Sequence, residues 1–264
     1  MNRINQMFEK HKSENKKSLI SFLMAGDQGL DHTKKMCHLL KDSGTDLLEI
    51  GVPFSDPLAD GKTNQEAAKR ALQNNIDVSD ILQLVKEIRS EGFDLPIVLF
   101  SYLNPVFQYG YKRIAKECRD SGVDGLLLVD LPPEEADGYV KAMDKENIKA
   151  VFLASPTTSR ERLKKIDRLS SGFVYYVSRT GVTGEKAELS SSLNSELEIV
   201  KDNIKSPLVV GFGISTGEQA KVVSENCDGI VVGSAIVKRI PEAIDASGIN
   251  KLKEFVSSLS NAIN

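Results

Sequence analysis

The stretch LVVGFGISTGEQAKVVSENCDGIVVG, residues 208–233, contains one strand–helix–strand unit. Two short apolar runs, residues 208–211 and 229–232, enclose a polar segment, residues 218–225, in which apolar side chains recur every three or four positions. Strands that are apolar throughout are typical of parallel sheets covered on both faces, and parallel neighbours need a crossover of about this length. The stretch therefore predicts two parallel strands joined by a helix.

The same alternation extends along the whole chain of 264 residues. We expect eight strands, at residues 19–25, 46–50, 96–100, 125–129, 150–154, 173–177, 208–211 and 229–232. Helical patterns follow them, at residues 30–41, 64–73 with 78–89, 106–120, 133–145, 160–169, 194–201, 218–225 and 252–259. Eight such units predict a single α/β barrel of the (β/α)8 (TIM) type, since these barrels fold as one domain of roughly 250 residues.

A doubly wound sheet is the alternative architecture, and its usual mark is a G-x-G-x-x-G turn after the first strand. This chain has AGDQG at residues 25–29, which does not fit that pattern. No linker rich in Gly, Ser or Pro divides the sequence, so residues 1–264 are predicted to be one domain. An additional amphipathic segment at residues 2–11, with Ile4, Met7 and Phe8 on one side, either closes the bottom of the barrel as an N-terminal helix or is a frayed start.

Charge and cysteine content narrow the classes of function. The net charge is −3 and no basic stretch lies beside aromatic residues, which argues against binding to nucleic acid or to a membrane surface. The three cysteines are far apart and lack a C-x-x-C pair, so neither a disulfide nor a metal site is predicted. The polar N-terminus has no signal-peptide pattern and no apolar run is long enough for a bilayer, so we expect a cytoplasmic protein.

Barrel enzymes carry their active sites at the carboxyl ends of the strands, so polar residues there are the candidates. Glu49 lies within the apolar run LLEIG, residues 47–51, where burial would raise its pKa toward neutrality and suit a general acid or base. Alternatively it pairs with a Lys or Arg, or points outward. Asp60 ends the loop PFSDPLAD, residues 53–60, and could equally be a turn or helix-cap residue.

Glycine-rich turns after the last two strands suggest a phosphate site. GFGIS at residues 211–215 and VGSA at residues 232–235 could surround an anion with backbone N–H groups, to which GVTG at residues 181–184 could add. The alternative is close strand-to-helix turns without a ligand. Asp130 is either a ligand or a cap for the helix that follows it, and the polar stretch at residues 184–195 is predicted to be a loose lid.

Two further expectations concern single residues. Tyr175 and Tyr176 are adjacent on the sixth strand, so one should face the barrel interior and the other the helices. The histidines, His11, His32 and His38, lie away from every predicted strand end and are expected at the surface. No Ser-His-Asp or Cys-His arrangement is supported.

The run LEIGVPFSDPLADG, residues 48–61, resembles the signature of the tryptophan synthase alpha chain family. The resemblance covers nearly the whole chain. It continues through YLNP (102–105), GVDG (122–125), DLP (130–132), PTT (156–158), YYVS (175–178), GVTG (181–184), VGFGIS (210–215) and VGSA (232–235).

This resemblance implies a fold, a reaction and a partner. The reaction is the retro-aldol cleavage of indole-3-glycerol phosphate to indole and glyceraldehyde 3-phosphate, without a cofactor in this chain. The partner is a tryptophan synthase beta chain that contains pyridoxal phosphate, in an αββα heterotetramer, and that condenses the indole with L-serine to give L-tryptophan. The partner-facing surface would include residues 53–60 and the turn near Asn104. A stand-alone lyase releasing free indole, and a catalytically weak subunit that activates the beta chain, are the alternatives.

The resemblance also assigns roles to single residues. Glu49 is implied as the general acid/base at the reacting carbon and hydroxyl, and Asp60 as the acceptor of the indole N–H. Thr183 is implied as the lid residue that steadies Asp60. The substrate pocket would be lined by Phe22, Phe100, Tyr102, Tyr175 and Phe212, and the phosphate held by Gly184, Gly213, Gly233 and Ser234.

Some positions depart from the commonest pattern of that family. They are Met24, Gln28, Lys62, Asn64 and Val129. None of them removes a group with an implied catalytic role. Lys62 and Asn64 adjoin the Asp60 loop, so they bear on the geometry of that loop and on its coupling to a partner.

Overall fold

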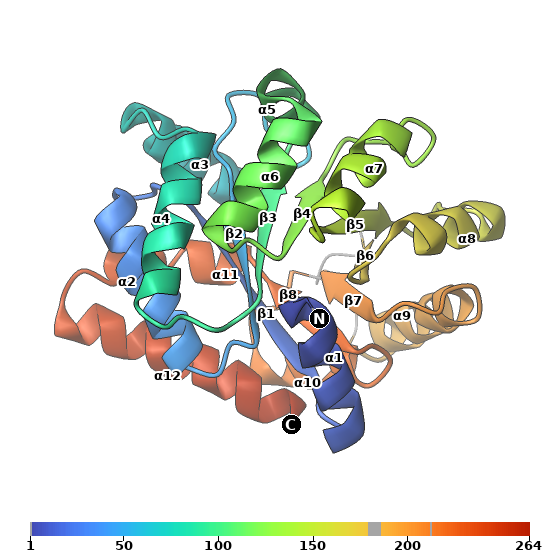
Figure 1. Cartoon of the computed structure of the whole chain (residues 1–264). Helices are drawn as coiled ribbons and strands as arrows, with labels where there is room; N and C mark the ends of the chain where they lie inside the picture. The colour runs from blue at the N-terminus through green and yellow to red at the C-terminus, as the bar shows by residue number, and fades with distance from the viewer. Residues whose placement is uncertain (1, 179–185, 212) are drawn as a thin grey trace.

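Eight parallel strands close into a barrel in a computed structural model, which describes residues 2–178, 186–211 and 213–264 (Figure 1). Each strand pairs with the next one along the chain and β8 pairs with β1, so the sheet has no edge. The strands are β1 (Ser18–Met24), β2 (Leu47–Gly51), β3 (Ile97–Ser101), β4 (Gly125–Leu128), β5 (Lys149–Ala154), β6 (Val174–Val177), β7 (Leu208–Gly211) and β8 (Gly229–Val232). The prediction of a (β/α)8 barrel is confirmed.

Helices surround this barrel (Figure 1). They are α1 (Arg3–Glu14), α2 (Leu30–Asp42), α3 (Lys62–Gln73), α4 (Val78–Ser90), α5 (Leu103–Tyr109), α6 (Tyr111–Ser121), α7 (Asp137–Lys145), α8 (Arg160–Leu169), α9 (Lys186–Lys201), α10 (Gly217–Ser224), α11 (Ser234–Val237) and α12 (Ala246–Ile263), with a 3-10 turn η1 (Ile240–Glu242) before α12. In the part of the chain described, no helix is both long and apolar enough to cross a membrane.

Several helices differ from the sequence expectation. The pattern at residues 106–120 forms two helices, because Gly110 has a φ of 90° and ends α5 just before α6 begins. The helix expected from residue 133 begins at Asp137, after a turn in which the Glu135 amide donates to the Pro132 carbonyl. The stretch at residues 184–195, expected to be loose, is helical from Lys186 onward; its serine-rich composition favours loops and hid the helix.

The barrel interior is filled by alternate side chains of the strands. Its buried cluster includes Phe22 of β1, Val98 of β3 and Tyr175 of β6. The intervening residues, such as Tyr176, pack against the helices, and the Tyr176 hydroxyl donates to Glu196 of α9 at 2.7 Å. One of the two adjacent tyrosines therefore faces inward and the other outward, as predicted.

Helix α1 closes the bottom of the barrel. Ile4, Met7 and Phe8 are buried in the interior cluster, and the Phe8 ring lies 5.8 Å from the Phe173 ring, centroid to centroid. Gly125 leaves room for this helix, since a Cβ there would approach Ile4 to 3.0 Å. Of the two interpretations of this segment, the helical plug is confirmed and the frayed start is wrong.

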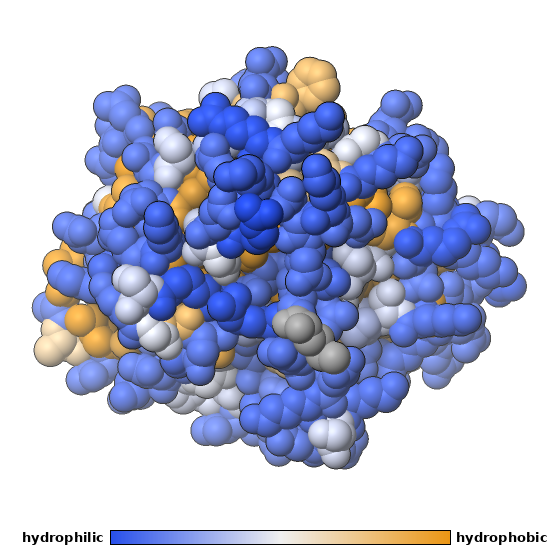
Figure 2. Space-filling model, in the orientation of Figure 1, coloured by the Kyte–Doolittle hydropathy of each residue, from blue (hydrophilic) through white to orange (hydrophobic). Residues whose placement is uncertain are grey.

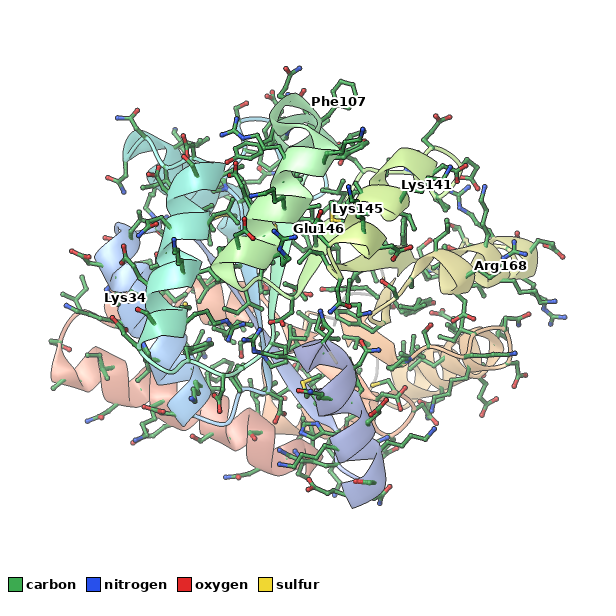
Figure 3. All side chains as sticks on the ribbon, viewed as in Figure 1. Lys34, Phe107, Lys141, Lys145, Glu146 and Arg168 are labelled. Atoms are coloured by element: carbon green, nitrogen blue, oxygen red, sulfur yellow. The ribbon has the colours of Figure 1, made fainter. Side chains whose placement is uncertain are left out.

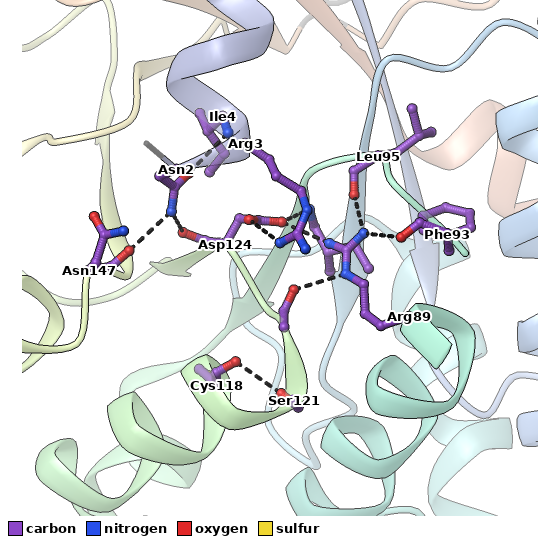
Figure 4. Close-up of polar contacts among 12 residues, drawn as sticks. Asn2, Arg3, Ile4, Arg89, Phe93, Leu95, Cys118, Ser121, Asp124 and Asn147 are labelled. Carbon is purple, nitrogen blue, oxygen red and sulfur yellow. Dashed lines mark hydrogen bonds and ion pairs between the residues drawn. The ribbon is translucent and has the colours of Figure 1, made fainter. Parts of the chain in front are cut away.

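Polar contacts fix the start of α1 to the barrel (Figure 4). The Asn2 side chain donates to the carbonyls of Asp124 and Asn147, at 2.9 and 3.0 Å. Arg3 and Arg89 pair with opposite oxygens of the Asp124 carboxylate, at 2.9 and 2.8 Å. Burial lowers the pKa of Arg89 to about 10, so this guanidinium still carries its charge at neutral pH.

The expectation that all three histidines lie at the surface is wrong for His11. Because α1 packs under the barrel, the His11 ring is buried, with Nδ1 2.9 Å from the Ser18 hydroxyl and Nε2 3.5 Å from the Asp46 carboxylate. Burial is the main cause that lowers its pKa, and Asp46 opposes it. His32 and His38 are partly exposed on α2.

Candidate active site

Glu49 is a carboxylic acid enclosed in the barrel interior. It lies on β2 between Phe22 of β1 and Val98 of β3 in the strand register. Its side chain is 0% exposed, and neither carboxyl oxygen has a hydrogen-bond partner among the described residues. The two alternatives, an ion pair and an outward orientation, are therefore wrong for this residue within the described part of the chain.

The enclosure sets the protonation state of Glu49. Burial raises its pKa from 4.5 to about 8, because water no longer solvates the ionised form. With that pKa about nine-tenths of the ligand-free molecules carry the proton at pH 7. A group with a pKa close to the working pH can donate a proton in one step and accept one in the next.

Asp60 is the second carboxyl group of the site and has a different environment. Its Oδ2 accepts a hydrogen bond of 2.9 Å from the Tyr102 hydroxyl, which in turn accepts from the Ala59 amide at 3.0 Å. Burial raises the pKa of Asp60, while Tyr102 and Asn64 oppose that rise by favouring the ionised form. Asp60 thus has hydrogen-bond donors where Glu49 has none.

The loop conformation explains how Asp60 comes to face Tyr102. The Asp60 amide donates to the Pro57 carbonyl at 3.1 Å, which closes a turn. Helix α3 begins two residues later at Lys62, and its N-cap is Gly61, which makes no side-chain cap bond. The turn interpretation of Asp60 is therefore confirmed and the helix-cap interpretation is wrong.

Aromatic rings surround the two carboxyl groups. Phe22 and Phe100 meet edge to face with centroids 5.3 Å apart, and Phe54 lies 5.3 Å from Tyr102. Tyr175 is buried in the interior cluster, and its pKa is raised well above the usual range by burial and then by the charges of Glu49 and Asp60.

Two glycines at the ends of strands make room for these rings. A Cβ at Gly51 would lie 2.7 Å from the Phe22 ring, and a Cβ at Gly211 would lie 2.8 Å from the Tyr175 ring. Larger residues at these positions would therefore clash with the two rings unless the rings moved. The structure therefore brings together six of the predicted site residues, Phe22, Glu49, Asp60, Phe100, Tyr102 and Tyr175.

Three of the predicted phosphate residues, Gly213, Gly233 and Ser234, follow β7 and β8, which are neighbouring strands. Gly213 is exposed and has a φ of 59°, a left-handed conformation that suits glycine. Gly233 is the N-cap of α11, whose first residue is Ser234, and it lies against Phe22 of the interior cluster. Thr183, Gly184 and Phe212 lie outside the described residues.

Two observations differ from the residue-level expectations. Asp130 accepts a hydrogen bond of 2.6 Å from the Leu103 amide, so it caps the start of α5 rather than the helix that follows it. Asn64, noted in the sequence only as a departure from a pattern, lies in the first turn of α3, and its Oδ1 is buried without a hydrogen-bond partner among the described residues. Lys62 is exposed, and no ion pair between it and Asp60 is found among the described residues.

Metal chemistry finds no support in the described ranges. No group of three or more His, Cys, Asp or Glu side chains there could hold a metal ion. Cys37, Cys118 and Cys227 are buried and free, and burial raises the thiol pKa of each.

Comparisons with known proteins agree with this geometry. The model of the tryptophan synthase alpha chain family matches residues 8–264. The tryptophan synthase alpha chain of Pelobacter propionicus is 43% identical over 263 residues, which cover 100% of this chain and 98% of that one. The alpha chain of Legionella pneumophila (strain Philadelphia 1) is 44% identical over 246 residues, 93% of this chain and 90% of the relative.

Solved structures show the same similarity. The tryptophan synthase subunit alpha from Legionella pneumophila strain Paris has a TM-score of 0.92 and 40% identity, covering 100% of this chain and 98% of that one. A chain from the aminoacrylate-bound tryptophan synthase of M. tuberculosis has a TM-score of 0.89 and 30% identity, with 100% of both chains covered.

Proposed function

Because the chain belongs to the tryptophan synthase alpha chain family, it is a lyase that cleaves indole-3-glycerol phosphate, and we propose that Glu49 and Asp60 divide the proton transfers of that cleavage. The observation that carries this proposal is the complete burial of Glu49, whose carboxyl oxygens have no hydrogen-bond partner in the described part of the chain. An ionisable group is costly to keep in such a place unless a ligand uses it. Asp60, half-buried and hydrogen-bonded, supplies the second and contrasting carboxyl group.

The proposed chemistry uses Glu49 twice. Its proton goes to C3 of the indole ring, which leaves positive charge on the ring nitrogen. The resulting carboxylate then takes the proton of the side-chain hydroxyl, the bond between C3 and that carbon breaks, and its electron pair returns to the ring. Indole and an aldehyde form, and Glu49 ends protonated as it began.

Asp60 acts on the ring nitrogen in this scheme. Its carboxylate accepts the indole N–H and stabilises the positive charge that develops there when C3 is protonated. Such a carboxylate must stay ionised, which the hydrogen bond from Tyr102 favours. Burial thus favours the protonated form of Glu49 that can donate, while the hydrogen bond from Tyr102 opposes the effect of burial on Asp60.

The remaining pocket residues bind the two ends of the substrate. Phe22, Phe100, Tyr102, Tyr175 and Phe212 are proposed to contact the indole ring. Gly184, Gly213, Gly233 and Ser234 are proposed to bind the phosphate through backbone N–H groups at strand-to-helix turns. Thr183 is proposed to steady Asp60. The aromatic contacts around Phe22 and Tyr102, and the glycine turns after β7 and β8, support these assignments.

As a member of this family the chain needs no cofactor of its own, and pyridoxal phosphate is found in the beta chain. We propose that the alpha chain docks on such a beta chain in an αββα heterotetramer and passes indole to it for condensation with L-serine to L-tryptophan. The similar M. tuberculosis chain comes from a structure of tryptophan synthase, which supports a shared assembly.

Two exposed apolar side chains support the docking surface. Leu58, in the Asp60 loop, is 91% exposed, and Phe107, on α5 beyond Asn104, is 62% exposed. Phe107 projects from the end of α5 in Figure 3, on a face that is otherwise largely hydrophilic in Figure 2. Large apolar groups exposed at the rim of a site are typical of a surface that a partner covers.

The decisive experiment is an indole-release assay on the purified chain, alone and with a tryptophan synthase beta chain. Weak release that rises strongly with the beta chain is expected. High release without it would favour a stand-alone lyase that frees indole. Absence of release under both conditions would favour a subunit that only activates its partner, although Glu49 and Asp60 argue against that role.

We also propose that residues 1–264 form one domain and that the protein is cytoplasmic. Strands β1 and β8 pair directly, and α1 from the N-terminus packs into the interior cluster, so the barrel uses both ends of the chain. The free cysteines are consistent with a reducing compartment. Protease digestion without a stable intermediate fragment is the expected result for one domain.

A further inference from the structure

Gln65 contacts the Asp60 loop from the first turn of α3. Its backbone amide donates to the carbonyl of the N-cap residue, Gly61, at 3.0 Å, which is the hydrogen bond that starts the helix. Side chains in a helix tilt toward its N-terminus, so a residue at this position reaches back over the segment that precedes the helix. The Gln65 side chain therefore meets the loop that ends at Asp60.

The side-chain amide of Gln65 binds both ends of one turn. Its Nε2 donates to the Asp60 carbonyl at 2.8 Å and to the Pro57 carbonyl at 3.3 Å. The same two residues are joined directly, because the Asp60 amide donates to the Pro57 carbonyl at 3.1 Å. Since both acceptors are carbonyl oxygens, reversing the side-chain amide would set Oε1 against them, so these contacts fix its orientation.

Tyr102 holds the same turn from another element. Its hydroxyl accepts from the Ala59 amide at 3.0 Å and donates to the Asp60 carboxylate at 2.9 Å. Tyr102 comes from the N-cap of α5, after β3, whereas Gln65 comes from α3. Tyr102 thus binds the carboxylate itself, and Gln65 binds the backbone that carries it.

The tip of this turn projects into solvent. Leu58 is 91% exposed, and its amide donates to the Asp56 carbonyl of the same loop at 2.9 Å. A segment with few buried apolar contacts opens locally at low cost in free energy. The position of Asp60 therefore depends on the hydrogen bonds that reach the turn from α3 and from Tyr102.

We propose that Gln65 is a positioning residue for Asp60, which holds the turn at residues 57–60 so that the Asp60 carboxylate faces the substrate. This inference rests on the proposed role of Asp60 in the cleavage. The two hydrogen bonds from Gln65 to backbone carbonyls carry it. Gln65 acts through Asp60 and needs no contact with the reacting atoms.

The first test measures local opening of the turn, by hydrogen exchange of the Ala59 and Asp60 amides followed by NMR in the full chain. Gln65→Met keeps the length of the side chain and removes its donor. The loss of two hydrogen bonds is expected to raise the exchange rate of both amides by roughly 5–30-fold. Gln65→Glu, which presents only acceptors when ionised, is expected to raise it at least as much.

Gln73→Met is the matched control for these variants. Gln73 is exposed and is the last residue of α3, at the end of the helix away from the Asp60 loop. This substitution removes the same amide group from the same helix. It is expected to leave the exchange rates of the Ala59 and Asp60 amides unchanged.

Steady-state kinetics of indole release test whether Gln65 acts through Asp60. The Asp60 carboxylate is proposed to stabilise charge that develops during the reaction, so Gln65→Met should lower kcat roughly 5–30-fold and change KM less than about 2-fold. In an Asp60→Asn background, Gln65→Met should cause no further loss of kcat, because the group that it positions is absent. A residue that only stabilised the fold would cause the same loss in both backgrounds.

Unchanged exchange rates in both Gln65→Met and Gln65→Glu would overturn the proposal, and so would an equal loss of kcat with and without Asp60. Circular dichroism and the thermal midpoint check that each variant is folded. The exchange measurement needs no turnover. A parent chain without lyase activity would therefore refute the proposed function, while the exchange rates still decide whether Gln65 holds the turn.

Discussion

Glu49→Gln is predicted to make the ligand-free protein more stable while it abolishes the reaction. In the unfolded chain Glu49 has its ordinary pKa of 4.5, whereas in the folded barrel its pKa is about 8. The folded state therefore binds more protons than the unfolded state between these values, so the free energy of unfolding falls as pH rises through that window. Glutamine has the same shape and no charge to bury.

The size of the effect follows from the two pKa values. At pH 7 the unfolded chain gains about 3 kcal/mol from ionising Glu49, which the folded protein cannot gain. At pH 5 the corresponding figure is below about 1 kcal/mol. The stability difference between Glu49→Gln and the parent should thus be small at pH 5 and grow to about 3 kcal/mol at pH 7.

Urea denaturation of both proteins at pH 5, 6, 7 and 8 measures this difference. Glu135→Gln, at an exposed position, is the control, and its difference from the parent should not change with pH. In the same preparations indole formation by Glu49→Gln should fall by about 10²–10⁴ or more, with substrate binding largely kept. A stability difference for Glu49→Gln that is independent of pH would refute the reasoning about burial, and near-normal turnover would refute the catalytic role.

Three other variants test the surroundings of the two carboxyl groups. Tyr102→Phe removes the hydroxyl that donates to Asp60. Steady-state kinetics should show kcat/KM reduced roughly 10-fold or more, because a hydrogen bond to a charged group is lost. An unchanged kcat/KM would contradict this prediction. Gly51→Ala places a methyl group 2.7 Å from the Phe22 ring. Thermal unfolding should show that the free energy of unfolding falls by about 1–3 kcal/mol, and KM should rise. Unchanged stability and KM would mean that the ring can move away. Leu58→Asp changes a side chain that is 91% exposed, so the free energy of unfolding should change by less than about 0.5 kcal/mol. Activation of indole release by a beta chain should be lost. Retained activation would place the docking surface elsewhere.

The sequence was enough to predict the barrel, because the alternation of apolar runs and helical patterns is local, whereas Glu49 and Asp60 were candidates whose roles came from the family resemblance. An ionisable residue inside an apolar strand, such as Glu49, can be recognised from the sequence alone. The lack of a hydrogen-bond partner for Glu49 among the described residues could not be predicted, because it depends on the neighbouring strands. Apolar residues, Phe22 of β1 and Val98 of β3, stand beside Glu49 in the strand register. Likewise Asp60 was recognisable, but the donor on its carboxylate is Tyr102, from another strand end.

The expectations that failed also depend on distant contacts. His11 was expected at the surface because it lies away from every predicted strand end, and it is buried because Ser18 and Asp46 of the barrel contact its ring. Asp130 was assigned to the helix nearest in the sequence, whereas it caps a helix that begins 27 residues earlier, at Leu103. A cap across the mouth of a barrel leaves no periodic trace in the sequence.

The plug formed by α1 has a consequence for biosynthesis. It precedes all eight strands in the sequence, yet the carbonyls that bind Asn2 belong to Asp124 and Asn147, which are translated much later. Until about half of the chain has been translated, the strands against which α1 packs are incomplete. The apolar face formed by Ile4, Met7 and Phe8 therefore stays uncovered during that time. Helix α1, which closes the bottom of the barrel, therefore remains unpacked during part of synthesis. In that interval it is the segment most in need of protection from wrong contacts.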